Sequence, residues 1–153
     1  MRVVSAVATF PGSVHDAESV WYDTSRWHHW VVGLHRVESI TGPWPQVGAE
    51  VRWRSTPAGR GEVRERVVGY EPLDGQTLEV SDDSIRATQS VSFSPQEENV
   101  EVSLRLAYEL KQRSVLMALV DLIFIRRAMT RSLEQTLSRF GAELEAAQRP
   151  DDG

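Results

Sequence analysis

The sequence predicts an α+β fold in which a seven-stranded antiparallel sheet curves around a long C-terminal helix. Three observations lead to this prediction. One valine-rich strand is followed by two short helices, residues 34–110 alternate apolar and polar side chains between turn signals, and an apolar helical pattern closes the chain. A period of two is typical of half-buried strands, and a period near 3.6 of amphipathic helices. This order of elements leaves an apolar space between the sheet and the last helix.

The first strand and the two short helices occupy residues 2–30. Residues 2–10 are rich in valine, and Pro11-Gly12 is a turn signal that ends the strand. Ser13 is suited to cap the first helix, because its hydroxyl can accept a hydrogen bond from a backbone N–H of the first turn. Trp27 and Trp30 lie three residues apart, which indicates a second short helix with both indoles on one face.

Six further strands are expected in the middle of the chain. Proline, glycine, asparagine and aspartate separate the alternating segments, as in an antiparallel meander. The pattern is clearest in the last strand, where Leu104, Leu106 and Tyr108 share one face. The predicted strands are residues 34–41, 48–56, 61–70, 76–81, 86–94 and 99–110.

A single long helix is expected from Ser114 to about Ala147. Its later half carries one apolar stripe, formed by Met129, Leu133, Leu137, Phe140 and Leu144. Its first three turns are apolar almost all round, so more than one surface would have to cover them. The sheet, the helical pair, a second subunit and a membrane surface all remain possible covers. Residues 1–147 are therefore expected to form one domain, followed by a disordered tail at 148–153.

Composition narrows the classes of function. The chain has 153 residues, a net charge of −5 and no cysteine, which argues against nucleic acid as a partner and excludes disulfides and thiolate chemistry. The start of the chain is too soon polar for a secretory signal, so a cytoplasmic location is expected. The most apolar segment, residues 115–125, is interrupted by Asp121 and falls short of the roughly 20 residues that span a bilayer, so no stable membrane insertion is expected.

Several local motifs support a resemblance to a known superfamily. They are Ala17-Glu-Ser-Val-Trp21 followed by Asp23 and Trp30, then Val47-Gly48, then Val67-Val-Gly-Tyr-Glu-Pro72, and then the closing helix. With the order of elements, they make the chain resemble the helix-grip (START-like, SRPBCC) superfamily, and within it the polyketide cyclase/dehydrase-like branch. The resemblance covers nearly the whole chain. It implies a hydrophobic small-molecule ligand and no cofactor, and it supplies no catalytic signature.

The alternation of the strands assigns one face of the sheet to the interior if the charged side chains point to solvent. Adding one tryptophan of the helical pair and part of the last helix's stripe gives a predicted ligand-binding set. An alternative is that these side chains simply fill the core. The predicted set is Trp30, His35, Val37, Val51, Trp53, Glu65, Val67, Gln89, Val91, Phe93, Leu104, Leu106, Tyr108, Met129, Leu133 and Leu137.

Glu65 and Tyr108 are the candidates for catalysis. A carboxyl group that faces an apolar cavity has a raised pKa and can serve as a general acid or base. Solvation at the open end of the strand, or pairing with an arginine, is the alternative for Glu65. Tyr108 could orient a ligand carbonyl or hydroxyl, or could make a structural hydrogen bond. No metal site is expected, because the adjacent His28 and His29 point in different directions and lack a second ligand pair.

Three functions remain open at the level of sequence. The first is binding or transport of a hydrophobic small molecule, such as a lipid or a polyketide-like compound, between the sheet and the last helix. The second is an aromatase/cyclase or dehydratase reaction in the same cavity. The third is a protein-interaction module, with a possible homodimer formed through the apolar start of the last helix.

Overall fold

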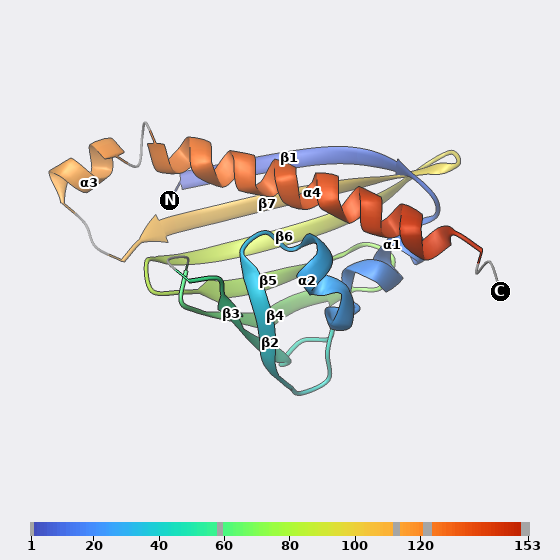
Figure 1. The fold of residues 1–153 in the computed structure, drawn as a ribbon, viewed down its shortest axis with the longest axis horizontal. Coiled ribbons are helices and arrows are strands. Elements are labelled where there is room, and N and C mark those ends of the chain that lie inside the picture. The colour runs from blue at the N-terminus through green and yellow to red at the C-terminus, as the bar shows by residue number, and fades with distance from the viewer. Residues whose placement is uncertain (1, 58–59, 112–113, 121–123, 151–153) are drawn as a thin grey trace.

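A computed structural model describes residues 2–57, 60–111, 114–120 and 124–150 of the chain. Seven strands form one antiparallel sheet in the order β1-β7-β6-β5-β4-β3-β2. The sheet curves around the C-terminal helix, as Figure 1 shows. The strands are β1 (Arg2–Pro11), β2 (Leu34–Thr41), β3 (Glu50–Ser55), β4 (Glu62–Glu71), β5 (Gly75–Ser81), β6 (Ile85–Gln96) and β7 (Asn99–Leu110).

The helices lie before β2 and after β7. Between β1 and β2 are α1 (Val14–Trp21), the 3-10 turn η1 (Thr24–Arg26) and α2 (Trp27–Trp30), and after β7 follow α3 (Val115–Val120) and α4 (Arg126–Gln148). The fold is the predicted helix-grip architecture, with all seven strands at their expected places. The predicted single closing helix is wrong in one respect, because the described residues form two helices, with α3 set apart beyond the end of β7 (Figure 1). Residues 121–123 lie outside the described residues.

The end of α4 also differs from the prediction. The helix includes Gln148, which the sequence placed in a disordered tail. The Gln148 side chain donates from Nε2 to the backbone oxygen of Pro11 at 3.1 Å, so the last turn of α4 is tied to the end of β1. Residues 151–153 lie outside the described residues.

The start of α1 follows from its capping residue. Ser13 has an extended backbone, and its Oγ accepts a hydrogen bond from the Asp16 N–H at 3.0 Å. This bond satisfies one of the donors that the first turn of a helix leaves unpaired. The acidic side chain of Asp16 also lies at the positive end of the helix. The predicted cap is confirmed.

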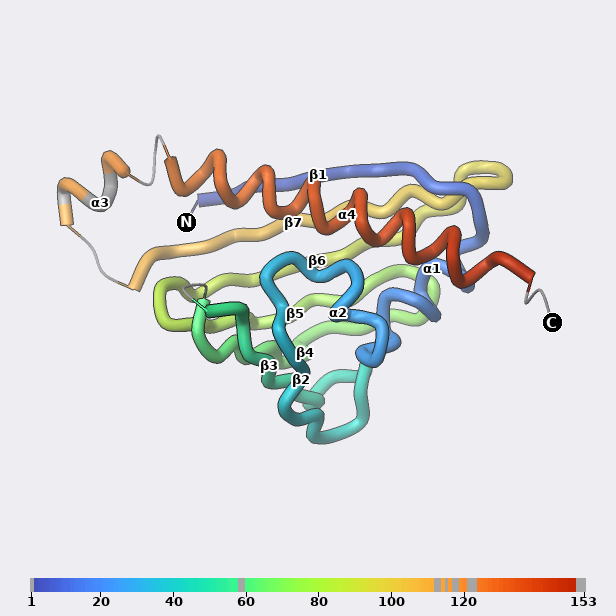
Figure 2. Tube along the Cα trace, in the orientation of Figure 1, coloured from blue at the N-terminus to red at the C-terminus, as the bar shows by residue number. Residues whose placement is uncertain are grey.

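An aromatic cluster joins α4 to the rest of the fold. Phe140 is fully buried, and its ring centroid lies 5.0 Å from that of Trp21, 5.1 Å from that of Trp30 and 5.7 Å from that of Phe10. These edge-to-face contacts connect α4 with β1, α1 and α2. Figure 2 shows α4 running alongside β1 over much of its length.

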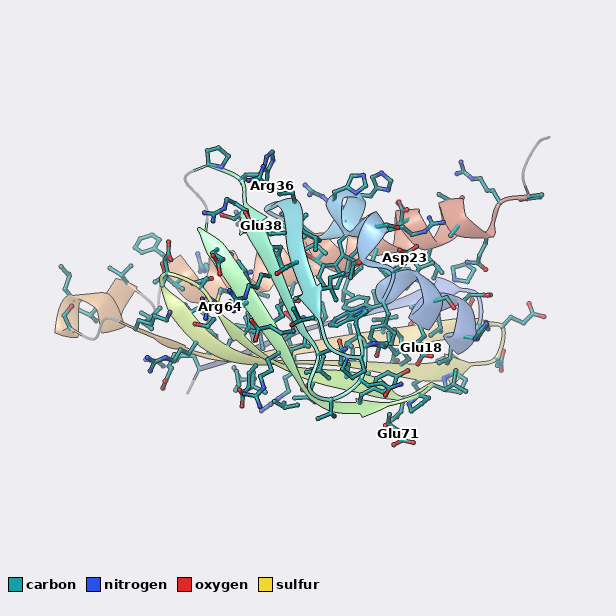
Figure 3. All side chains as sticks on the ribbon, turned by 90° about the horizontal axis from the view of Figure 1, so that it is seen from below. Glu18, Asp23, Arg36, Glu38, Arg64 and Glu71 are labelled. Carbon is teal, nitrogen blue, oxygen red and sulfur yellow. The ribbon has the colours of Figure 1, made fainter. Side chains whose placement is uncertain are left out.

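Charged side chains cover the outer face of β2, β3 and β4. Glu38 accepts a hydrogen bond from Arg54 Nε at 2.9 Å and lies 3.6 Å from Arg36 Nη2, and Figure 3 shows Arg36 and Glu38 next to each other. The hydrogen bond from Arg54 holds the pKa of Glu38 below its usual range. On β4, Arg64 Nε is bonded to Glu62 at 3.1 Å. These charges point to solvent, which is the condition under which strand alternation assigns the opposite face to the interior.

Strand β2 does not follow the predicted alternation. Its pairing with β3 shifts register between Leu34 and Arg36 and again between Val37 and Ser39, so two β-bulges interrupt the strand. Each bulge moves the following side chain to the other face. His35 is therefore exposed, and the prediction that it faces inward is wrong. Val37, which is opposite the buried Trp53, keeps its predicted side.

Candidate functional site

A pocket of about 220 Å³ lies between the concave face of the sheet, helix α2 and the first half of α4. Strands β5, β6 and β7 supply apolar side chains to its wall, because every second residue of these strands points to the concave face. The largest of them are Leu78, Ile85, Leu104 and Leu106, all of which are buried. These four side chains form the main apolar contribution of the sheet to the wall.

The helices supply aromatic and flexible side chains to the opposite wall. Trp21, Trp27 and Trp30 line the pocket from α1 and α2, and Met129 and Leu133 line it from α4. The indole of Trp27 is fixed by a hydrogen bond of 2.9 Å from its Nε1 to the Trp21 backbone oxygen. These large rings present flat apolar surfaces to the pocket.

Glu65 places a carboxyl group on the concave face. It lies on β4 opposite Val51 of β3 and Val80 of β5, its exposed fraction is 7%, and it lines the pocket. Burial raises the pKa of Glu65, while the charge of Arg60 and the nearby indole of Trp53 lower it by less. The indole N–H does not reach hydrogen-bond geometry with the carboxyl group, since Trp53 Nε1 has no bonded partner among the described residues. The net direction favours the protonated acid.

Arg60 and Asp82 form an ion pair at one edge of the pocket. Arg60 Nε donates to Asp82 Oδ2 at 2.6 Å, and the Asp82 side chain is almost completely buried. Asp82 Oδ1 also accepts hydrogen bonds from the N–H groups of Ser84 and Ile85, at 2.7 and 2.9 Å. The guanidinium of Arg60 lies over the Trp53 ring, 5.4 Å from its centroid. Four interactions therefore hold this charged pair in place.

Three buried polar atoms of pocket-lining residues lack a hydrogen-bond partner within the described part of the chain. They are the Nε1 atoms of Trp30 and Trp53 and the Oε1 atom of Gln76. The Gln76 amide is oriented by a bond of 2.9 Å from its Nε2 to the Pro45 backbone oxygen. Buried polar groups usually have partners, so their concentration around the pocket distinguishes this region from the rest of the core.

All but two of the predicted ligand-binding residues divide into two groups. Those that line the pocket are Trp30, Trp53, Glu65, Gln89, Leu104, Leu106, Met129 and Leu133. Those that are buried elsewhere in the core are Val51, Val67, Val91, Phe93, Tyr108 and Leu137. Val37 is half-buried at the edge of the sheet, and His35 faces solvent. Tyr108, the second catalytic candidate, is fully buried and lies outside the pocket wall.

Sequence reasoning missed part of the wall. Gln76 and Leu78 alternate with Thr77 and Glu79 along β5, so the period of two could have placed them on the concave face. Arg60, Asp82 and Ser84 come from the ends of strands and from turns, where no periodic pattern assigns a direction. The remaining missed wall residues are Trp21, Trp27, Val31, Val32, Ile85, Ser132 and Thr136.

The residues of the wall offer hydrogen bonding, proton transfer, charge and apolar contact. No three His, Asp or Glu side chains of the described residues come together in an arrangement that could hold a metal ion. His29, from the histidine pair near the pocket, instead lies 3.1 Å from Glu143 Oε1 through its Nδ1. Within the part of the chain that the structure describes, no helix is both long enough and apolar enough to cross a membrane.

Comparison with protein families gives a match over almost the whole chain. Residues 1–145 match the model of the family described as polyketide cyclase / dehydrase and lipid transport. No curated protein matches the sequence. The family match covers every element that builds the pocket.

Solved structures with the same fold share little sequence with this chain. A protein from Thermus thermophilus is 18% identical, with a TM-score of 0.74, over 97% of this chain and 100% of that one. A START superfamily protein from Mycobacterium smegmatis is 14% identical, with a TM-score of 0.74, over 94% and 97% of the two chains. Norcoclaurine synthase from Thalictrum flavum, in complex with dopamine and hydroxybenzaldehyde, is 12% identical, with a TM-score of 0.70, over 98% and 89%. At these identities the likeness establishes the fold.

Proposed function

The chain belongs to the polyketide cyclase / dehydrase and lipid transport family, and from this premise we propose that it binds a hydrophobic small molecule in the pocket between the sheet and α4. The observation that carries the proposal is the pocket of about 220 Å³ with its mostly apolar wall. An apolar cavity of about 150 Å³ is large enough to bind benzene. The space here suits a molecule of about two fused rings or a short acyl chain.

Native mass spectrometry of the freshly purified protein tests this function directly. A bound mass that disappears on denaturation is the expected result. Met129→Trp fills the pocket from α4 and should remove the bound mass, whereas Gln135→Trp places the same side chain on the exposed side of the helix and should retain it. Absence of any bound mass, together with no binding from a panel of lipids and polyketide-like compounds, would contradict the proposal.

A second candidate is an aromatase/cyclase or dehydratase reaction on a polyketide-like chain. Glu65 favours it, because a protonated carboxyl group in an apolar pocket can donate a proton to a departing hydroxyl group and so assist loss of water. Glu65→Gln cannot transfer a proton but keeps the size of the side chain. It should abolish turnover and leave substrate affinity within a few-fold of the wild type. Retained turnover would exclude this role of Glu65.

A third candidate is association of two copies through the segment before α4. Leu116, Leu119 and Phe124 are 70%, 54% and 67% exposed, which is unusual for large apolar side chains close together in sequence. Light scattering on the purified protein should then show a dimer that Leu119→Ser and Phe124→Ser convert to a monomer. A monomeric wild type at high concentration would contradict this candidate.

A further inference from the structure

We propose that the pocket selects uncharged ligands that carry a hydrogen-bond acceptor, such as an aryl ketone, and that the carboxyl group of Glu65 donates the hydrogen bond to that acceptor. This inference rests on the proposed binding function and specifies its ligand class. It follows from the position of three ionisable side chains in the pocket wall, Glu65, Arg60 and Asp82.

Glu65 is a buried carboxyl group in a mainly apolar setting. Its strand neighbours on β3 and β5 are Val51 and Val80, which offer no polar side-chain atom. The polar groups that act on it are the Trp53 indole and the charge of Arg60, and their combined effect is smaller than that of burial. An ionised carboxylate in this position would lose its hydration with only partial compensation. The neutral acid is therefore favoured, in line with the raised pKa, and a neutral acid has one O–H to donate.

Arg60 is the nearest cationic group, but Asp82 already balances its charge. Arg60 Nε donates to Asp82 Oδ2 at 2.6 Å, and two backbone N–H groups donate to Asp82 Oδ1, so the ion pair is held in place. Lys111 Nζ donates to the backbone oxygen of Asp82. A carboxylate ligand that approached Arg60 would also approach the Asp82 carboxylate. An ammonium ligand would meet Arg60 over the Trp53 ring, where a cation already lies. Among the described residues that line the pocket, neither ionic class finds an unbalanced opposite charge, since Lys111 is not part of the wall.

The remaining wall reinforces a preference for flat, uncharged molecules. Trp21, Trp27 and Trp30 face the leucine-rich sheet across the pocket, so a planar ring system can contact apolar groups on both sides. Besides Glu65, the wall holds the indole N–H groups of Trp30 and Trp53, which are unpaired within the described part of the chain, so the substitutions at Glu65 are needed to show which donor the ligand uses. The ligand's acceptor would be directed toward β4, where Glu65 lies, and its apolar body toward β6 and β7.

Four naphthalene derivatives of similar size test the proposal by isothermal titration calorimetry at pH 6.5. They are 2-acetylnaphthalene, 2-ethylnaphthalene, 2-naphthoate and 2-(aminomethyl)naphthalene. The ketone should bind about three- to ten-fold more tightly than the ethyl compound, which has the same shape but no acceptor. The naphthoate and the ammonium compound should bind at least about ten-fold more weakly than the ketone, because each brings an unbalanced charge into an apolar site.

Two substitutions at Glu65 identify the donor. Glu65→Gln retains an N–H donor without charge, so the preference for the ketone over the ethyl compound should survive. Glu65→Leu keeps a similar volume without a donor, and the preference should fall to about one. If Glu65→Leu does not fold, the comparison of the four ligands on the wild-type protein still decides the ligand class, and an ethyl compound that binds as tightly as the ketone still excludes Glu65 as the donor.

The outcomes separate this proposal from the binding function on which it rests. If the ethyl compound binds as tightly as the ketone, or if Glu65→Leu keeps the preference, the pocket binds apolar molecules but Glu65 is not the donor. If the naphthoate or the ammonium compound binds most tightly, the assignment of an uncharged ligand is wrong. If none of the four binds and no ligand co-purifies, both the binding function and this proposal are overturned.

Discussion

Arg60 donates from Nε to the buried carboxylate of Asp82 at 2.6 Å. This pair joins the loop before β4 to the turn between β5 and β6, so two segments at the same edge of the pocket are fixed relative to each other. The same carboxylate accepts hydrogen bonds from the N–H groups of Ser84 and Ile85 and thereby shapes the turn. One side chain thus supports both the turn and the edge of the pocket.

Replacing Asp82 should therefore lower the stability of the folded protein. Asp82→Ala removes the acceptor of three hydrogen bonds and leaves two backbone N–H groups unpaired, so the free energy of unfolding should fall by about 2–4 kcal/mol. Urea denaturation measures the loss. Asp83→Ala, at the exposed neighbouring position, should change it by less than about 0.5 kcal/mol. Equal losses in the two variants would show that the network contributes little.

Because the pKa of Glu65 is raised, we expect the stability of the protein to depend on pH. Below the pKa of the unfolded chain the acid is protonated in both states. As pH rises, the unfolded state ionises first, so the stability that Glu65 contributes is lost progressively up to the folded-state pKa. Glu65→Gln does not titrate, and its stability relative to the wild type should therefore increase between pH 5 and pH 8.

Urea denaturation of both proteins at the two pH values measures this increase. Glu79→Gln is the matched control, because Glu79 lies on the neighbouring strand β5 with its side chain exposed. Its effect should be the same at pH 5 and pH 8. A Glu65→Gln effect that does not change with pH would mean that the Glu65 carboxylate is stabilised in the folded state.

Strand alternation predicted the inward faces well where the strands are regular. Val51 and Trp53 on β3, and Val63, Glu65 and Val67 on β4, are all buried as the period of two requires. Strand alternation did not predict the faces of β2, because bulges at His35 and Glu38 change the period and leave His35 exposed. No residue type in this strand indicates a bulge, so the apolar and polar pattern alone could not have predicted that His35 is exposed.

Alternation identifies a face, but it does not separate pocket from core. Val67 and Leu78 are paired across β4 and β5 and point to the same side, yet only Leu78 lines the pocket. The difference depends on where α2 and α4 cover the sheet, which is a property of the assembled fold. Arg60 and Asp82 were missed for a similar reason, since they meet through the folding of a loop and a turn that lie 22 residues apart.

Glu143 on α4 connects that helix to the helical pair before β2. Its Oε1 accepts a hydrogen bond of 2.8 Å from Arg26 Nη1 and lies 3.1 Å from His29 Nδ1. Partial burial disfavours the carboxylate, but the bonds with His29 and Arg26 together hold the pKa of Glu143 below its usual range. The stability from this contact is present above the unfolded-state pKa and is lost as pH falls through the folded-state pKa.

Glu143→Gln should lower the free energy of unfolding by about 0.5–1.5 kcal/mol at pH 7, and by much less near pH 3. Denaturation curves at the two pH values test both the size and the sign. The control is Glu145→Gln on the same helix, where the side chain is exposed and its contact with Arg149 is long, at 3.5 Å. If the two variants behave alike at pH 7, the link between α4 and the helical pair is not a significant source of stability.

Gly141 lies where α4 packs against the Phe10 side chain of β1. A methyl group at this position would lie 2.4 Å from Cε1 and 2.7 Å from Cδ1 of the Phe10 ring, which packs edge to face against Phe140. In a helix interior, alanine is usually more stable than glycine by about 0.5–1 kcal/mol. Here the steric conflict should outweigh that gain, and Gly141→Ala should destabilise the protein by about 1–3 kcal/mol.

A double-mutant cycle distinguishes steric conflict from a change in helix propensity. Phe10→Leu removes the ring atoms that the new methyl group would meet, so Gly141→Ala should cost much less in that background, with a coupling of about 1 kcal/mol or more. Ser138→Ala, at an exposed position one turn earlier in α4, measures the effect of helix propensity alone. If Gly141→Ala stabilises the wild type as Ser138→Ala does, then the Phe10 ring moves aside freely and the close approach of β1 to α4 does not depend on a glycine.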